Sequence, residues 1–349
     1  MKLSEISQII LARDSTSVQL QYALDQFALL CSEISNIQPD PSYTAWSDDT
    51  FLAQGVAINP QAAAFCINDY RRSVVFLRGV FAALQTLEKR AVAGESIRVL
   101  YAGCGPFATL LLPLLSRFDP SKLEICLVDI HQESLDSVAG LLKALSLDNY
   151  NITLVQADAC EYQHSTRLDL IVVETMQKAL EQEPQFSATA TLAAQLDVNG
   201  IFVPEEITIE LCLVKLQEEF EHYKKYGSLD KQKLLNEAER HPICELICLS
   251  SSEVKALSEQ VEFCAELARS ALPLQDVMIP AIAGLSLYQP VLFTRITVFS
   301  EHTLDDYESS LTLPSRCFDL EPLREGALYR ATYVLGNYPK IHWQEITKR

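Results

Sequence analysis

The spacing of apolar residues changes twice along the 349-residue chain and divides it into three zones. Over residues 1–95 apolar positions recur at steps of three and four, which predicts amphipathic helices. A second helical stretch is expected over about 59–88. An earlier helical stretch, before residue 38, has an apolar face that consists of Leu20, Ala23, Leu24, Phe27, Leu30 and Cys31. We therefore expect an N-terminal helical cap over residues 1–95.

Residues 96–204 alternate short apolar runs with helical segments. A run without polar alternation, such as Leu168–Val173, is typical of a strand buried on both faces. Strands alternating with helices predict a parallel sheet covered by helices, so the expected fold class is α/β and Rossmann-like. The predicted strands are 97–102, 123–129, 152–156 and 168–173, and the predicted helices are 107–118 and 132–147.

Residues 205–349 change character again. Branched and aromatic residues dominate 207–214, 291–299 and 327–335, which predicts strands of an antiparallel β barrel or sandwich-like domain. The charged stretch 217–272 between the first two is expected to be a helical insert.

Composition narrows the classes of partner. The chain has 28 Lys and Arg against 46 Asp and Glu, a formal charge of −18, and this argues against a nucleic-acid-binding face. The sequence has no run of about 18 apolar residues, so it predicts no membrane-spanning helix. Residues 1–5 lack the pattern of a signal peptide, and the ten cysteines lack paired C-x-x-C spacing. We expect a cytoplasmic protein with reduced thiols and no metal site.

A glycine loop follows the first predicted strand. Gly103, Cys104 and Gly105 stand where the chain is expected to turn into a helix, so that backbone N–H groups at the helix start face a ligand. Asp129 ends the next strand, where a carboxylate can hold both ribose hydroxyls. Asp158 follows the third strand, in reach of an adenine amino group. Together they predict a nucleotide or nucleoside site.

This pattern leaves alternatives open. Gly-x-Gly-x-x-Ala followed by an acidic residue also suits an NAD(P)-dependent oxidoreductase. Such an enzyme should repeat its βαβαβ half, and no second fingerprint follows residue 150. The glycines can also form an ordinary tight turn, and Asp158 can be a solvated residue at a strand end.

The order of further motifs resembles the class I S-adenosylmethionine-dependent methyltransferases, and more narrowly the protein arginine methyltransferases. Asp69-Tyr70-Arg71-Arg72-Ser73 is similar to that family's Asp-x-x-Arg-Thr element, which implies that Arg72 binds the cofactor carboxylate. The strand ending at Glu174 resembles the one that leads into the double-glutamate loop. Residues 199–204 resemble the Gly-Gly-x-x-x-Pro turn into the barrel, and His342-Trp343 resembles the Thr-His-Trp loop.

The resemblance implies roles for three further side chains. Glu174 and Glu183 are nine positions apart, as the family's two glutamates are, so they would grip a guanidinium and leave one nitrogen free to accept a methyl group. Glu174 would also contact the cofactor, and His342 would assist proton handling. The alternative is that Glu183 is an exposed charge in a polar segment and that His342 only packs.

The implied function is an S-adenosylmethionine-dependent methyltransferase acting on a guanidinium or other basic nitrogen of a protein or a small molecule. The loop after Glu174 lacks the family's Trp-x-Gly-Tyr pattern, so a small-molecule methyltransferase stays an alternative, as does a catalytically inactive scaffold. The insert at 217–272 would correspond to a dimerisation arm, which implies a homodimer. Its charges can equally belong to a solvated helix.

Overall fold

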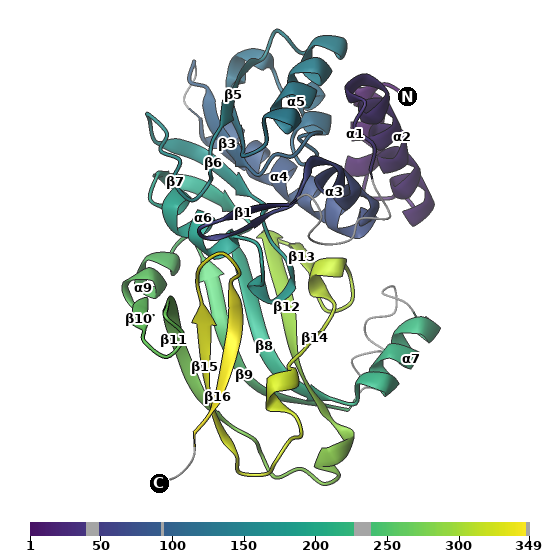
Figure 1. Ribbon diagram of the computed structural model, residues 1–349. Coiled ribbons are helices and arrows are strands. Elements are labelled where there is room, and N and C mark those ends of the chain that lie inside the picture. The colour runs from purple at the N-terminus through teal and green to yellow at the C-terminus, as the bar shows by residue number, and fades with distance from the viewer. Residues whose placement is uncertain (40–48, 92–93, 227–238, 347–349) are drawn as a thin grey trace.

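The computed structural model describes residues 1–39, 49–91, 94–226 and 239–346. The helical cap predicted over 1–95 is largely present (Figure 1). It also contains a small hairpin that periodicity did not predict, formed by β1 (Thr50–Leu52) and β2 (Gly55–Ala57). The helices are α1 (Leu3–Leu11), α2 (Ser17–Ser35), α3 (Pro60–Phe65), the 3₁₀ turn η1 (Cys66–Asn68) and α4 (Tyr70–Arg90).

The second predicted helix is broken where η1 meets α4. Asp69 stands at this junction and accepts a hydrogen bond from the Arg72 N–H at 3.1 Å, so it caps the N-terminus of α4. Farther along, Gly79 of α4 lies so close to Val298 that a Cβ atom would come within 2.4 Å of a Val298 methyl. Glycine therefore allows α4 to pack directly on a strand of the C-terminal region.

The central sheet has five parallel strands in the order β5-β4-β3-β6-β7, which confirms the α/β prediction. Side chains of β3 alternate between two apolar clusters: Val99 and Tyr101 pack with α4 and α5 (Gln132–Ala144), and Leu100 and Ala102 pack with α6 (Gln185–Ala193). Both faces are therefore buried. The strands are β3 (Ile97–Ala102), β4 (Leu123–Asp129), β5 (Asn151–Gln156), β6 (Leu168–Val173) and β7 (Leu196–Val203).

Two antiparallel sheets form the C-terminal region, below the parallel sheet in Figure 1. One has the order β13-β12-β8-β9 with β14 added beside β12, and the other has the order β10-β11-β15-β16. This fits the sandwich-like form of the prediction. The strands are β8 (Glu206–Val214), β9 (Arg240–Ser250), β10 (Glu262–Cys264), β11 (Arg269–Met278), β12 (Gln289–Phe299), β13 (His302–Leu304), β14 (Ser315–Arg316), β15 (Leu328–Val334) and β16 (Lys340–Glu345).

The helical insert predicted over 217–272 is wrong for most of its described part. Only α7 (Leu216–Tyr226) and α9 (Val254–Glu259) are helical, whereas β9 and the start of β11 pair in the two sheets. Residues 227–238 lie outside the described part of the chain. The apolar residues of β9 find partners in β8, and this long-range pairing outweighs the local charge pattern.

The predicted helix over 107–118 is also wrong. The chain runs through turns and then η2 (Leu112–Arg117), a 3₁₀ helix. Ala108 has a φ of 43°, outside the right-handed helical region, and Pro113 has no N–H to give to a preceding carbonyl. Between β6 and the antiparallel region lies the strand β7, and the motif similarity predicted only a turn at 199–204 there.

In the part of the chain that the structure describes, no helix has the length and apolarity to cross a membrane. The domain boundaries at 95 and 204 and the homodimer stay predictions.

Candidate active site

A cavity of about 1010 Å³, its open mouth included, lies at the carboxyl ends of β3, β4, β5 and β6. Strand order reverses there, since β4 and β6 lie on opposite sides of β3, and ligands of open α/β sheets bind at such points. All the residues predicted to bind a cofactor line this cavity, namely Arg72, Gly103, Cys104, Gly105, Asp129, Asp158 and Glu174. Glu183 lines it as well, so one cavity unites eight of the nine predicted site residues.

The backbone N–H groups of the glycine loop are used in hydrogen bonds within the protein. Gly103 and Gly105 have φ values of 72° and 63°, which favour glycine, and a Cβ on Gly103 would meet the Thr175 methyl at 2.5 Å. The N–H groups of Gly103 and Cys104 donate to the Val128 carbonyl at 2.9 and 3.2 Å. The expectation that these N–H groups face a ligand from a helix start is therefore wrong. The loop shapes the cavity wall instead.

Asp129 is buried at the end of β4 and joins three segments of the site. Its Oδ2 accepts from the Gly105 N–H at 2.8 Å, and its Oδ1 accepts from the His131 N–H at 2.9 Å. The His131 ring lies with Nδ1 3.5 Å from Asp129 Oδ1 and Nε2 3.1 Å from the Thr50 hydroxyl. Sequence reasoning missed His131, although its place two residues after a strand-ending aspartate is a usable signal.

Asp158 and Ser134 lie on the same side of the cavity. Asp158 accepts the Cys160 N–H at 2.8 Å through Oδ1. Ser134, in the first turn of α5, is 1% exposed, and its Oγ makes no hydrogen bond within the protein. Because buried hydroxyls are normally paired, the Ser134 hydroxyl indicates room for a polar partner from a ligand. Ser134 was not anticipated, since a serine in a helix is an ordinary residue.

Arg72 pairs with Glu174 at the opposite side. The guanidinium comes from the first turn of α4 and the carboxylate directly follows β6, and each side chain is 11% exposed. Burial by itself lowers the pKa of Arg72, but its neighbours, with the Glu174 carboxylate first among them, together outweigh burial and raise the pKa above its ordinary value. Arg72 is therefore a permanent cation, and burial raises the pKa of the neighbouring Cys66 thiol, which stays protonated.

The loop between the two glutamates has a strained backbone. Ala179, Leu180 and Gln182 have φ values of 57°, 56° and 66°, a region that costs non-glycine residues energy. The antiparallel region holds them there: the Ala179 N–H donates to the Thr294 hydroxyl at 2.8 Å, and the Tyr333 hydroxyl donates to the Leu180 carbonyl at 2.7 Å. The sheet thereby fixes the course of the chain from Glu174 to Glu183.

Glu183 is partly buried in the cavity wall. Burial first, and then the nearby Glu174 charge, raise the pKa of Glu183 to about 8, although Arg72 acts against them. The carboxyl group is therefore largely protonated at neutral pH without a bound cation. Two carboxyl groups compete for one guanidinium, an arrangement that a second cation would relieve.

His342 lies elsewhere. It is in β16 opposite Thr332 of β15 and is not among the described residues that line the cavity. Just before β16, the Pro339 carbonyl accepts the Gln182 N–H of the glutamate loop at 2.8 Å. The predicted catalytic role of His342 has no support from this placement. No group of three metal-ligating side chains comes together in the described ranges.

The cavity lining is acidic. Among the described residues it contains four carboxyl groups, from Asp129, Asp158, Glu174 and Glu183, and one permanently charged cation, Arg72. His131 adds an imidazole to this described lining. The arrangement can bind a ligand that carries hydroxyl groups and positive charge, and it repels a polyanion.

Comparison with known proteins gives the following similarities. No family model matches the chain, and no curated protein matches it. Among solved structures it resembles the PRMT1 enzyme–prozyme heterotetrameric complex of Trypanosoma brucei with AdoHcy, at 13% identity and a TM-score of 0.42, over 81% of this chain and 96% of that one. It also resembles protein arginine methyltransferase 10 of Arabidopsis thaliana in an open conformation, at 10% identity and a TM-score of 0.43, over 80% and 96% of the two chains.

Proposed function

We propose that the protein is an S-adenosylmethionine-dependent methyltransferase whose acceptor is a guanidinium or another basic nitrogen. The observation that carries the proposal is the acidic cavity at the strand ends, whose described lining contains four carboxyl groups and a single guanidinium. S-adenosylmethionine is a nucleoside with a ribose, an amino-acid arm and a positive sulfonium, and it supplies an electrophilic methyl group. The cavity offers a partner of the right kind to each of these parts.

The residues present fit that cofactor. Asp129, Asp158 and Arg72 line one cavity. There Asp129 would accept hydrogen bonds from the ribose hydroxyls, Asp158 would accept one from an adenine amino group, and Arg72 would pair with the carboxylate of the amino-acid arm. The buried Ser134 hydroxyl, which has no partner within the protein, supplies a further polar contact. The acidic lining favours the sulfonium charge electrostatically.

Glu174 and Glu183 are the candidate acceptor-binding residues. Their carboxyl groups can each accept hydrogen bonds from a cationic acceptor, hold it in place and concentrate its charge away from the reacting nitrogen. A bound cation also favours the ionised form of Glu183. In that form a Glu183 carboxylate oxygen accepts the proton that the acceptor nitrogen loses on methylation.

The oxidoreductase alternative fits less well. A dinucleotide carries a pyrophosphate, which such enzymes bind at free N–H groups of a glycine loop and at a helix N-terminus. Here the N–H groups of Gly103, Cys104 and Gly105 are all used within the protein, and the loop leads into turns and a 3₁₀ helix. The neighbouring carboxyl groups would repel the phosphates.

Isothermal titration calorimetry with S-adenosylhomocysteine and, separately, with NADH tests the proposal. We expect binding of S-adenosylhomocysteine and none of NADH. Transfer of labelled methyl groups to an arginine-rich peptide and to a small guanidine then separates a protein acceptor from a small-molecule acceptor. A wild-type protein that binds NADH but not S-adenosylhomocysteine would overturn the proposal.

A further inference from the structure

The Asp69 carboxylate bridges the start of α4 and a segment of the C-terminal region more than 200 residues later in the chain. Its Oδ1 caps α4 by accepting the Arg72 N–H at 3.1 Å. Its Oδ2 accepts three hydrogen bonds, from the Ser309 hydroxyl at 2.7 Å and from the N–H and hydroxyl of Ser310 at 2.7 and 2.8 Å. A helix cap needs only the first of these four bonds.

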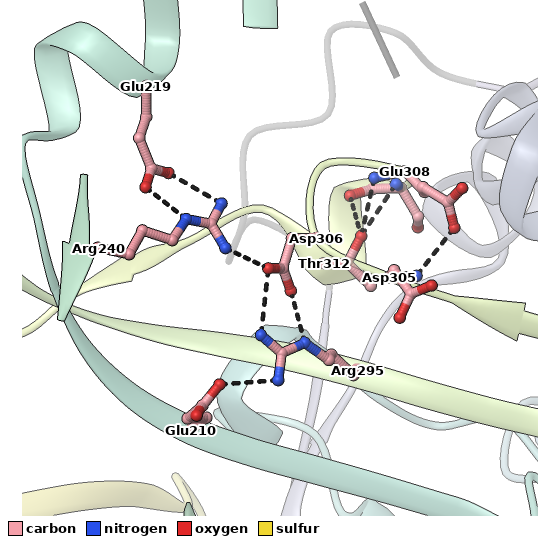
Figure 2. Close-up of polar contacts among 9 residues, drawn as sticks. Glu210, Glu219, Arg240, Arg295, Asp305, Asp306, Glu308 and Thr312 are labelled. Atoms are coloured by element: carbon pink, nitrogen blue, oxygen red, sulfur yellow. Dashed lines mark hydrogen bonds and ion pairs between the residues drawn. The ribbon is translucent and has the colours of Figure 1, made fainter. Parts of the chain in front are cut away.

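Segment 305–312, between β13 and β14, is itself tightly fixed. The hydroxyl of Thr312, which is fully buried, accepts the N–H groups of Glu308 and Ser309 at 3.2 and 3.1 Å (Figure 2). Asp306 is 5% exposed and binds two guanidinium groups, from Arg240 at 2.5 Å and Arg295 at 3.0 Å. These hydrogen bonds and ion pairs fix the conformation of segment 305–312.

Ion pairs connect segment 305–312 to the antiparallel sheet and to α7. Arg240 also binds the buried Glu219 of α7, with Nε 2.6 Å from Oε1, and Arg295 binds Glu210 of β8 at 2.7 Å (Figure 2). On the other side, Glu308 forms an ion pair with Arg71 at 3.0 Å. Contacts from segment 305–312 therefore reach both Asp69 and Arg71 at the start of α4, next to Arg72.

We propose that segment 305–312 is a positioning element for Arg72, acting through Asp69, and that it sets the affinity for the carboxylate of the ligand. Arg72 is in the first turn of α4, so the direction in which its side chain enters the cavity depends on where that turn is held. Asp69 and Ser310 are positioning residues in this scheme, and Arg72 makes the ligand contact. The inference rests on the proposed function.

Two ligands separate positioning from general folding. S-adenosylhomocysteine has the amino-acid arm that Arg72 would bind, whereas 5′-methylthioadenosine keeps the nucleoside and lacks the carboxylate. Methylthioadenosine binding reports that the rest of the cavity is intact. A defect confined to Arg72 lowers affinity for the first ligand and spares the second.

Two variants remove the bridge by different routes. Asp69→Ser keeps a good helix-capping residue but is too short to reach Ser309 and Ser310. The double variant Ser309→Ala with Ser310→Ala keeps Asp69 and removes two of its three donors in the segment. For both we expect about a tenfold loss of S-adenosylhomocysteine affinity and less than about a twofold change for methylthioadenosine. Ser310→Thr, which keeps the hydroxyl, should retain wild-type affinity.

A matched control exists in the same chain. Asp119 caps η3 (Pro120–Lys122) and accepts the N–H and hydroxyl of Ser121 at 2.9 and 2.8 Å, away from the cavity lining. Ser121→Ala should change neither affinity. If the wild type binds both ligands and the bridge variants keep the wild-type affinity ratio, the positioning role is refuted while the proposed function stands. If the wild type binds neither ligand, the proposed function fails and this inference fails with it.

Discussion

In the described part of the chain, a cluster of charged side chains in the cavity at the parallel sheet contrasts with another on the antiparallel sheet beside α7. In the second, Glu210, Glu219 and Asp306 share the guanidinium groups of Arg240 and Arg295, and each arginine contacts two carboxylates (Figure 2). In the first, four carboxyl groups of the described lining share one cavity with a single guanidinium, that of Arg72, which pairs with Glu174. Similar residue types are thus balanced in one place and unbalanced in the other.

The difference shows how a structural charge cluster is distinguished from a binding site. Buried charges are tolerated when partners compensate for lost hydration, as in the cluster around Asp306. The cavity instead contains a carboxyl group with a pKa raised to about 8 and a serine hydroxyl without a partner within the protein, and the loop that joins its two glutamates is strained. Such uncompensated features are kept where a ligand completes them. The following predictions test this contrast.

The largest expected effect is on turnover by Glu174→Gln. This substitution keeps the size of the side chain and removes the charge that would hold a cationic acceptor, so kcat should fall about 10²- to 10³-fold. Steady-state transfer of labelled methyl groups measures the loss. Asp169→Asn, at the start of the strand that leads to Glu174 and paired there with Arg98, is the control and should keep most of the activity. Full activity of Glu174→Gln would contradict its assignment to the site.

Asp306→Ala tests the balanced cluster. It removes a buried carboxylate from two arginines, each of which keeps one other partner, so we expect the free energy of unfolding to fall by about 3 kcal/mol. Urea denaturation provides the measurement. The exposed pair of Arg324 and Glu345 serves for comparison, and Glu345→Ala should change stability by less than about 0.5 kcal/mol. Equal effects of the two substitutions would contradict the larger contribution of the buried cluster to stability.

Asp129→Ala is expected to weaken S-adenosylhomocysteine binding by about 2 kcal/mol, because a charged partner of the ribose is lost. Calorimetry measures the change. Asp136→Ala removes an exposed carboxylate from α5, where Gln132 donates to it at 2.8 Å, and should leave affinity unchanged. Since Asp129 also fixes Gly105, Asp129→Asn separates loss of charge from loss of loop structure. Undiminished affinity in both Asp129 variants would remove Asp129 from the binding site.

Glu183→Gln should change stability in the opposite direction to Asp306→Ala, and only at high pH. The pKa of Glu183 is raised to about 8 in the folded protein, so folding favours the protonated form and the wild type loses stability as pH rises from about 5 to about 9. The variant should therefore have a higher Tm than the wild type at about pH 9 and a similar Tm at about pH 5.

The same substitution tests proton acceptance by Glu183. Wild-type kcat/KM should increase as pH rises through about 8, the pKa of Glu183, because the ionised carboxylate binds the acceptor and takes its proton. Glu183→Gln should lose this ascending limb. Glu181→Gln, on a nearby residue outside the cavity lining, is the matched control. Identical pH profiles for wild type and Glu183→Gln would remove Glu183 from the reaction.

Much of the parallel sheet could be predicted from local pattern. The bounds of β3, β4 and β6 agree with the predicted strands because short apolar runs buried on both faces have a strong signature. The insert at 217–272 failed for the converse reason. β9 has charged residues among its apolar ones and becomes a strand through pairing with β8, which no local pattern records.

The residues of the candidate site also differ in whether local sequence could predict them. Residues at or just after strand ends, such as Asp129, Asp158 and Glu174, were predictable, because parallel strands bring their carboxyl ends to one edge. Ser134 was missed, because nothing in the sequence shows which side chains of a following helix turn inward, and His131 was missed although its place two residues after Asp129 was a usable signal. His342 was placed by motif similarity alone, and the structure puts it on β16 away from the cavity lining.

The sequence by itself determined the parallel sheet and the set of charged residues at its strand ends, since both follow from the alternation of short buried runs with polar residues. Only the tertiary structure decided how those charges are balanced. Arg72 meets Glu174, Asp69 meets Ser310, and the glutamate loop is held by Tyr333, through contacts between segments about 100 to 240 residues apart. Compensation of a buried charge depends on distance in space, and spacing along the chain does not encode it.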